Sequence, residues 1–233
     1  MSTIEQNLQA VRRSIAQAAD QAQRPAADVM LLAVSKTFGA DAVLAAADAG
    51  QTAFGENYLQ EALDKIAAVQ AAQPDAGLEW HFIGPIQSNK TRPITEHFDW
   101  VHTVEREKIA VRLSEQRPAE LPELNICLQV NISGEASKSG VAPADLPALA
   151  HAVAQLPRLR LRGLMAIPEP ETDPARQRAA FAQLRQLFQQ LRDGGLALDT
   201  LSMGMSADLQ AAVLEGATIV RVGSAIFGSR NYS

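Results

Sequence analysis

The chain has 233 residues, 47% of them hydrophobic, and a formal net charge of −5. That length and composition suffice for one sizeable core, and we expect a single domain over residues 1–233. Because the sequence has no basic stripe, no apolar leader and no run of about 20 apolar residues, nucleic-acid binding, secretion and membrane insertion are not expected. The single cysteine, Cys127, is interpreted as a small buried hydrophobe, and without a disulfide we expect a cytoplasmic location.

The first predicted element is an amphipathic helix near the N-terminus. Its apolar residues recur at spacings of three and four and therefore share one face: Ile4, Leu8, Val11, Ile15, Ala18 and Ala22. Ser2 and Glu5 have the spacing of a capping box, which favours a helix start at this point. The dipeptide Arg24-Pro25 ends the pattern, because proline cannot continue a helix.

Eight short apolar runs follow, and a helical stretch comes after each of them. The predicted strands span residues 29–34, 52–55, 78–84, 99–104, 124–132, 159–167, 200–204 and 217–223. Strands that alternate with helices form parallel sheets, and eight such units in about 200 residues favour a closed barrel. We therefore predict an α/β fold, a single-domain (β/α)8 TIM barrel with an additional N-terminal helix that covers one barrel end. The helix after the third strand is expected to break near Pro93.

Lys36 is the first candidate site residue, because the sites of such barrels lie at the carboxyl ends of the strands. It follows the apolar run 29–34, so its amine emerges where the barrel core ends. Partial burial there favours the uncharged amine, which can form a Schiff base with an aldehyde. The alternative is a lysine that extends to the rim and stays solvated.

The loops after the seventh and eighth predicted strands read MGMS and RVGS. Their glycines, Gly223 among them, let backbone N–H groups approach an anion, and Ser206 and Ser224 add hydroxyl donors. Alternatively, these are ordinary connecting turns. Arg221 is placed to bind a phosphate, to face a pyridine nitrogen or to form a salt bridge within the barrel. A lysine opposite a phosphate site is an arrangement that holds pyridoxal 5′-phosphate (PLP).

Seven motifs, in order along the chain, resemble those of the pyridoxal phosphate homeostasis proteins, a family of alanine-racemase-type barrels. They are LLAVSK (31–36), FGENY (54–58), WHFIGPIQSNK (80–90), VNISGEASKSG (130–140), RGLMAIP (162–168), LSMGMS (201–206) and RVGSAIFG (221–228). The resemblance implies that PLP is held as a Schiff base on Lys36, and that the protein controls the supply of free PLP and the balance of amino and keto acids. Carried over by motif, the other cofactor-binding residues are Asn57 close to the cofactor, Ser206, Gly223 and Ser224 at its phosphate, and Arg221 at its pyridine nitrogen.

The resemblance implies no established catalytic activity, so we expect a non-enzyme without catalytic residues. Racemases of this type take a second acid or base from another domain, and the chain, which ends at Ser233, leaves no room for one. The tyrosines are Tyr58 and Tyr232; Tyr58 is the internal candidate for that role, although packing at a helix start is the simpler interpretation. Two alternatives remain open: a weak PLP-dependent amino-acid racemase, and an aldolase that uses the lysine without a cofactor.

The remaining expectations concern metals and partners. No histidine pair has metal-ligand spacing with a partnering carboxylate, so no metal is predicted. Lys138 is either a solvated loop lysine or a second, transient aldehyde site, and Glu169 and Glu171 are expected to be solvated. We expect a monomer that binds PLP, with PLP-dependent apoenzymes as transient recipients and with no nucleic-acid or membrane partner.

Overall fold

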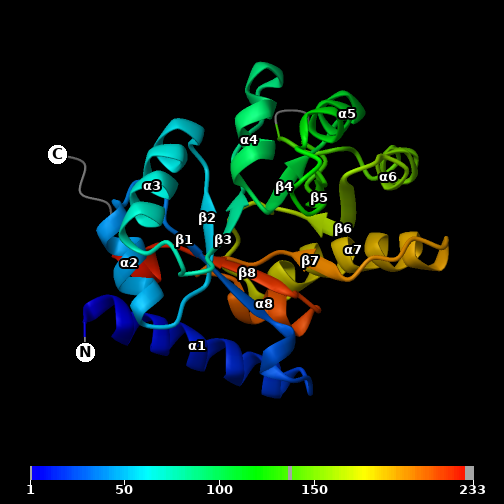
Figure 1. Cartoon of the computed structure of the whole chain (residues 1–233). Helices are drawn as coiled ribbons and strands as arrows, with labels where there is room; N and C mark the ends of the chain where they lie inside the picture. The colour runs from blue at the N-terminus through cyan, green and yellow to red at the C-terminus, as the bar shows by residue number, and fades with distance from the viewer. Residues whose placement is uncertain (1, 136–137, 229–233) are drawn as a thin grey trace.

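The computed structural model describes residues 2–135 and 138–228, so Tyr232 lies outside the described residues. Within those ranges, eight parallel strands form a closed barrel in the order of the sequence, with helices around it (Figure 1). The strands are β1 (Met30–Val34), β2 (Ala53–Glu56), β3 (Glu79–Phe82), β4 (Trp100–Val104), β5 (Leu124–Gln129), β6 (Leu159–Met165), β7 (Thr200–Ser202) and β8 (Ile219–Val222). Pairing of β1 with β8, in which Leu32 lies beside Arg221, closes the sheet. The predicted (β/α)8 barrel is confirmed.

A helix follows each strand, as predicted, and one more precedes the barrel. The helices are α1 (Thr3–Gln21), α2 (Ala40–Asp48), α3 (Leu59–Ala72), α4 (Thr91–His97), α5 (Glu107–Gln116), α6 (Leu146–Ala154), α7 (Pro174–Asp193), α8 (Leu209–Leu214) and α9 (Ser224–Phe227), with short 3-10 turns η1 (Ala26–Asp28) and η2 (Ser88–Lys90). At the start of α1 the N–H of Glu5 donates to Ser2 Oγ at 3.2 Å, which confirms the predicted cap. None of the helices in the described ranges has the length and apolarity of a membrane span.

Most predicted strand boundaries differ from the observed ones by one or two residues, and two expectations are wrong by more than that. Helix α4 does not break near Pro93, because Pro93 lies in its first turn, where backbone N–H groups have no intrahelical acceptor and a missing donor costs nothing. Strand β5 ends at Gln129 rather than at residue 132. Beyond it the chain turns to bridge Val130 with Val141, whose N–H donates to the carbonyl of Gln129 at 2.8 Å.

The position of α1 also differs from the prediction. Instead of covering a barrel end, α1 lies in the outer ring of helices and packs on α8, α9 and α2. The eighth unit supplies only the four-residue α9, so α1 takes up the space that a full eighth helix would fill. Side chains fix this position: Asn7 Nδ2 donates to the carbonyl of Ile226 at 2.9 Å, and Arg12 Nη2 donates to that of Gly50 at 3.0 Å.

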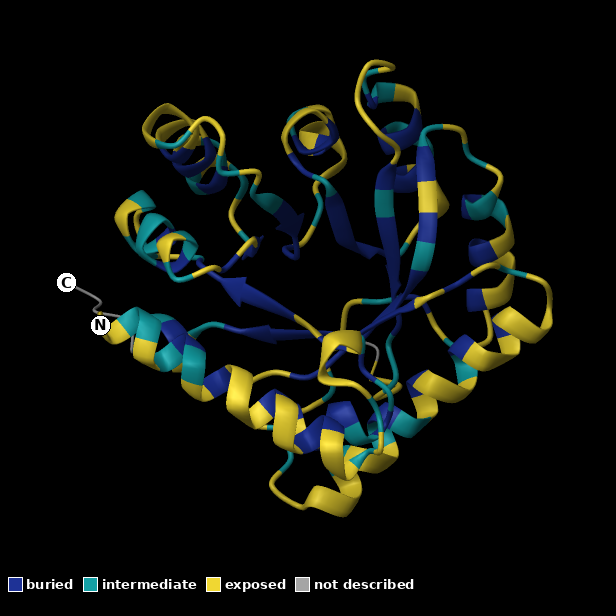
Figure 2. Cartoon of the chain, turned by 60° about the horizontal axis from the view of Figure 1, so that its bottom comes forward, coloured by how far each residue is buried: buried dark blue, intermediate teal, exposed yellow. Residues whose placement is uncertain are grey.

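The apolar core has two parts, one inside the barrel and one between the barrel and its helices. The interior cluster consists of Leu32, Val34, Ala53, Ile83, Trp100, Cys127, Met165 and Ile219. Figure 2 shows that the strands are buried almost throughout, whereas the exposed residues lie mainly on the outward faces of the helices and in the loops. Cys127 is fully buried, which raises the pKa of its thiol to about 12, so its interpretation as a small hydrophobe is confirmed.

Candidate functional site

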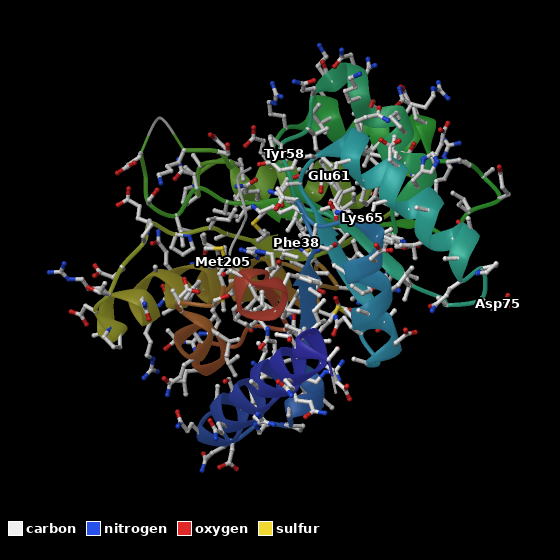
Figure 3. All side chains as sticks on the ribbon, turned by 90° about the vertical axis from the view of Figure 1, so that its left-hand side faces the viewer. Phe38, Tyr58, Glu61, Lys65, Asp75 and Met205 are labelled. Carbon is white, nitrogen blue, oxygen red and sulfur yellow. The ribbon has the colours of Figure 1, made fainter. Side chains whose placement is uncertain are left out.

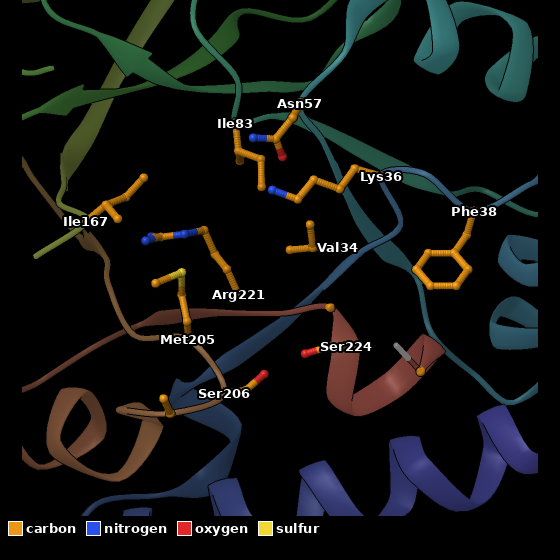
Figure 4. A pocket seen from close by; sticks show the side chains of 13 residues that line it. Val34, Lys36, Phe38, Asn57, Ile83, Ile167, Met205, Ser206, Arg221 and Ser224 are labelled. Carbon is orange, nitrogen blue, oxygen red and sulfur yellow. The ribbon is translucent and has the colours of Figure 1, made fainter. Parts of the chain in front are cut away.

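A cavity of about 340 Å³ opens at the carboxyl ends of the strands, where barrels of this class place their sites. All six predicted binding residues line it: Lys36, Asn57, Ser206, Arg221, Gly223 and Ser224. In Figure 4, Ser206 and Ser224 lie together on one side, Lys36 and Asn57 on the other, and Arg221 reaches in from β8. The structure therefore brings together residues that are up to 188 positions apart, from Lys36 to Ser224 (224 − 36).

Lys36 lies in a tightly held turn after β1. The next residue, Thr37, has a φ of +69°, in the left-handed region that non-glycine residues seldom adopt. The N–H of Thr37 donates to Glu61 Oε1 at 2.6 Å, which holds that conformation. On the other side, the carbonyl of Ser35 accepts a hydrogen bond from Lys65 Nζ at 2.8 Å. Lys36 is thus held by bonds to the residues before and after it.

A buried ion pair lies directly behind this turn and was missed in the sequence analysis. Lys65 Nζ is 2.6 Å from Glu56 Oε1 and 3.0 Å from Glu61 Oε1, and the Lys65 and Glu56 side chains are almost completely buried. Ser35 Oγ also donates to Glu56 Oε1, at 2.5 Å. Burial raises the pKa of Glu56, and the Lys65 ammonium opposes that rise. Figure 3 shows Glu61 and Lys65 together on α3.

Arg221 brings a buried positive charge to the cavity. Its Nη1 donates to Ser202 Oγ at 2.7 Å and its Nη2 to the carbonyl of Ala166 at 3.0 Å. Burial lowers the pKa of the guanidinium to about 10, which still leaves it charged at neutral pH. Because these partners in the described chain are a hydroxyl and a carbonyl, the alternative of a salt bridge within the barrel is wrong for Arg221.

The two glycine-containing loops approach the cavity closely with their backbones. A Cβ on Gly223 would lie 3.1 Å from the carbonyl oxygen of Val34, so a side chain there would force the backbone of β1 or β8 to shift by a few tenths of an ångström. In the other loop, Gly204 has a φ of +97°, and the N–H of Met205 donates to Asp208 Oδ1 at 2.6 Å. These constraints place Ser206 and Ser224 at the same side of the cavity.

The side-chain oxygen of Asn57 is buried, and no donor in the described chain reaches it. A buried acceptor without a donor costs about 1–3 kcal/mol. Since Asn57 lines the cavity, a ligand or water there can supply the missing partner. Together with a cation, two hydroxyls and an amine, this polar atom fits a compact, anionic, carbonyl-bearing ligand.

Gly84→Ala is expected to disturb the Asn57 side of the cavity. A Cβ at Gly84 would overlap the backbone oxygen of Asn57, which cannot move aside as a flexible side chain could. We expect the free energy of unfolding to fall by about 1–3 kcal/mol. Gly39→Ala is the control, because a Cβ there meets no atom within 4 Å. Equal denaturation midpoints for the two variants would contradict the expectation.

Other candidate residues lie away from the cavity or have ordinary partners. Tyr58 is 51% exposed at the start of α3 and is absent from the described cavity wall. Lys138 Nζ lies 3.9 Å from Glu169 Oε1 in a partly exposed ion pair, and Glu171 accepts bonds from its own loop's backbone. Among the described residues, no group of three or more histidine, cysteine or acidic side chains is placed to hold a metal.

A histidine contact inside the barrel was missed in the sequence analysis. His81 Nδ1 lies 2.8 Å from His102 Nε2, and His81 Nε2 lies 2.7 Å from Glu79 Oε1. The alternation of His81 within a strand was visible in the sequence, but its contact with a residue of the next strand depends on barrel register.

Comparison with known proteins gives a consistent result. The family model described as "Alanine racemase, N-terminal domain" matches residues 6–231. The chain is 66% identical to the pyridoxal phosphate homeostasis protein of Pseudomonas aeruginosa, covering 100% of this chain and 98% of that protein. The structure is similar to that of PipY from Synechococcus elongatus with PLP bound, with a TM-score of 0.84, 40% identity, and coverage of 97% of this chain and 100% of the other. Alanine racemase from Corynebacterium glutamicum shares the fold: its TM-score is 0.68 at 20% identity, covering 98% of this chain and 60% of that one.

Proposed function

The chain belongs to the alanine racemase N-terminal domain family, among its pyridoxal phosphate homeostasis proteins, and we propose that it binds PLP and takes part in PLP homeostasis. The matches to the Pseudomonas aeruginosa protein and to PipY extend over the whole barrel, so the proposal concerns the whole barrel. The homeostatic role covers the supply of free PLP and the balance of amino and keto acids.

One observation carries this proposal: a lysine amine, a buried guanidinium and two serine hydroxyls converge on a single cavity. PLP contains an aldehyde, a phosphate and a pyridine ring, and each has a chemically suitable partner there. We propose that Lys36 forms the Schiff base, that Ser206, Gly223 and Ser224 bind the phosphate, and that Arg221 faces the pyridine nitrogen. Asn57 has a polar side chain for the cofactor's remaining polar atoms.

Bound PLP supplies an electron-withdrawing ring conjugated to the imine, and the protein decides how far that ring acts as an electron sink. Arg221 keeps its charge at neutral pH and can only donate, so it favours an unprotonated ring nitrogen. Val34, Ile83 and Ile167 form apolar parts of the wall, beside which the pyridine ring can pack. The residues therefore favour retention of the cofactor over chemistry on it.

We propose that the protein is not an enzyme. Among the described residues that line the cavity, none is a tyrosine, histidine, cysteine or carboxylate that could serve as a second acid or base beside Lys36. Incubating the PLP-loaded protein with a panel of amino acids in deuterated water should leave their α-hydrogens unexchanged. Exchange that is lost in Lys36→Ala would instead establish the racemase alternative.

A titration of the purified protein with PLP tests the binding proposal. We expect visible absorbance that saturates at one PLP per chain, and a product that borohydride fixes covalently. Failure of the protein to bind added PLP would overturn the proposal. Covalent capture of a phosphorylated sugar without PLP would support the cofactor-free aldolase in its place.

Ser206→Ala is expected to weaken PLP binding modestly. It removes one hydroxyl donor from the phosphate side of the cavity, worth about 1 kcal/mol or roughly a fivefold higher Kd. Ser14→Ala, which changes an exposed hydroxyl on α1 that donates to Ala10, is the control. An unchanged Kd in Ser206→Ala, measured by absorbance titration, would place this serine outside the phosphate site.

We further propose that the protein acts as a cytoplasmic monomer and passes PLP transiently to apoenzymes that depend on it. The six proposed binding residues line one cavity of this chain. Sedimentation of the loaded protein at several concentrations, and transfer of PLP to an apo-aminotransferase, test the two parts separately.

A further inference from the structure

A continuous chain of five hydrogen-bonded side chains crosses the barrel interior. At the cavity, Arg221 Nη1 donates to Ser202 Oγ at 2.7 Å, and Ser202 Oγ lies 2.8 Å from His102 Nδ1. His102 Nε2 lies 2.8 Å from His81 Nδ1, and His81 Nε2 lies 2.7 Å from Glu79 Oε1. The Arg221–Glu79 chain therefore extends from the cavity into the first residue of β3, at the amino end of that strand.

The middle of the Arg221–Glu79 chain is buried, whereas the end at Glu79 is partly exposed. Ser202, His102 and His81 have no exposed surface, whereas the Glu79 side chain is 39% exposed. The ring of Trp100 stacks on that of His81, with centroids 5.2 Å apart and planes 7° from parallel. In such an apolar setting the polar atoms must satisfy one another, because an unpaired buried group is costly.

The two ends of the Arg221–Glu79 chain cannot exchange roles. A guanidinium only donates hydrogen bonds, and a carboxylate only accepts them. Acceptance by Glu79 requires a proton on His81 Nε2, which leaves His81 Nδ1 to accept from His102 Nε2. His102 Nδ1 then accepts from the Ser202 hydroxyl, whose oxygen in turn accepts from Arg221. If both imidazoles are neutral, every link thus runs in one direction and both rings are Nε2–H tautomers.

The charges around the two imidazoles agree with neutral rings. Burial lowers the pKa of His81, and the carboxylates that face it, Glu79 and Asp99, only partly offset this. Burial lowers the pKa of His102 further, and the neighbouring His81 and Arg221 act in the same direction. The hydrogen-bonded chain therefore has a charged donor at Arg221, a carboxylate acceptor at Glu79 and two neutral rings between them.

We propose that Glu79 is a positioning residue for the cavity: by fixing the direction of the Arg221–Glu79 chain, it turns the Ser202 oxygen toward Arg221 and holds the guanidinium in its donor orientation. The link from Arg221 to the PLP ring rests on the proposed function, whereas the direction of the chain does not. In Glu79→Gln the side-chain amide can both accept and donate a hydrogen bond. It therefore no longer fixes the direction of the Arg221–Glu79 chain, and the hydrogen bonds between the rings can also form in the reverse direction.

Nitrogen-15 NMR of the histidine rings, without PLP, tests the direction. The protein has four histidines, and the two that lie outside the Arg221–Glu79 chain provide internal references. His97 Nδ1 and His151 Nδ1 lie 2.9 Å and 2.8 Å from backbone carbonyls, which only accept, so these rings carry Nδ1–H. We expect His81 and His102 to show the opposite, Nε2–H pattern at neutral pH. An Nδ1–H or charged ring at either position would overturn the proposal.

The variant Glu79→Gln, with the exposed Glu120→Gln as control, tests the role of the fixed end. In Glu79→Gln we expect an Nδ1–H signal to appear for His81 and His102, and the Kd for PLP to rise roughly fivefold. Glu120→Gln should match the parent in both measurements. Unchanged tautomers, or an unchanged Kd, in Glu79→Gln would overturn the proposal. Absence of PLP binding by the parent would instead contradict the proposed function. The two failures can be distinguished, because the histidine tautomers are measured without PLP.

Discussion

Replacing Lys36 with alanine should abolish covalent attachment of PLP. The amine of Lys36 is the one lysine nitrogen among the described residues of the cavity wall, so no neighbouring amine can take its place. After borohydride treatment we expect the parent to carry PLP on the peptide that contains Lys36, and Lys36→Ala to carry none. Mass spectrometry of the digested proteins measures both.

Two other lysines serve as controls for this prediction. Lys90 lies at the end of the exposed η2 turn, and Lys138 is paired with Glu169 in a surface loop. Lys90→Ala and Lys138→Ala should keep the label on Lys36. Loss of the label in either variant, or a Lys36→Ala protein labelled at another lysine in equal yield, would remove Lys36 from its proposed role.

Removing Lys65 should have the largest effect on stability. In Lys65→Met the carboxylate of Glu56 stays buried without its main partner, and breaking one side of a buried ion pair costs about 3–5 kcal/mol. The ammonium also holds the Ser35 carbonyl directly before Lys36, so the turn that carries Lys36 loses a support. At neutral pH we expect a lower chemical-denaturation midpoint for Lys65→Met than for the parent, and PLP titration should show weaker binding by the variant.

The loss in Lys65→Met should depend on pH in a definite direction. Burial already raises the pKa of Glu56 above 4.5, and without the opposing Lys65 it rises further. The folded state then holds the Glu56 proton more tightly than the unfolded state, so stability falls as pH rises from about 4.5 through the raised pKa. The difference between parent and variant should be smallest at the acidic end of this window. Ser35 and Glu61 also face Glu56 and remain unchanged in both proteins.

A double variant separates lost charge from lost packing. Glu56→Gln combined with Lys65→Met removes both charges, and we expect it to recover most of the stability lost in Lys65→Met alone. Equal instability of the single and double variants, together with a loss that does not change with pH, would show that the Lys65 side chain matters for its volume rather than for its charge.

The sequence, with the family resemblance, was sufficient to predict the barrel and six of the residues that line its cavity. Repeated strand–helix units fix the order of a parallel barrel, and every strand's carboxyl end then faces the same opening. Lys36 and Arg221 could be assigned to one site in this way because each lies at or just beyond the end of a strand. Their roles toward PLP were suggested by the resemblance and remain predictions.

Contacts that depend on register could not be predicted in the same way. His102 and Ser202 are 100 residues apart, and they meet only because the interior faces of β4 and β7 place them at compatible heights across the barrel. Likewise, the contact of Lys65 with Glu56 could not be predicted from the sequence, because it depends on how α3 packs on the barrel. Strand order is encoded locally, whereas such pairs depend on tilt and on helix rotation, which no single segment specifies.

The placement of α1 between α8 and α2 has a consequence for how the molecule is made. During translation α1 is synthesised well before α8 and α9, on which it packs, and the bond from Asn7 to Ile226 spans 219 positions. Part of the apolar stripe of α1 therefore stays uncovered until α8 and α9 have been synthesised, and pairing of β8 with β1 is a late, long-range event. A nascent chain halted before β8 would expose that stripe, which makes such truncated products natural targets for chaperones.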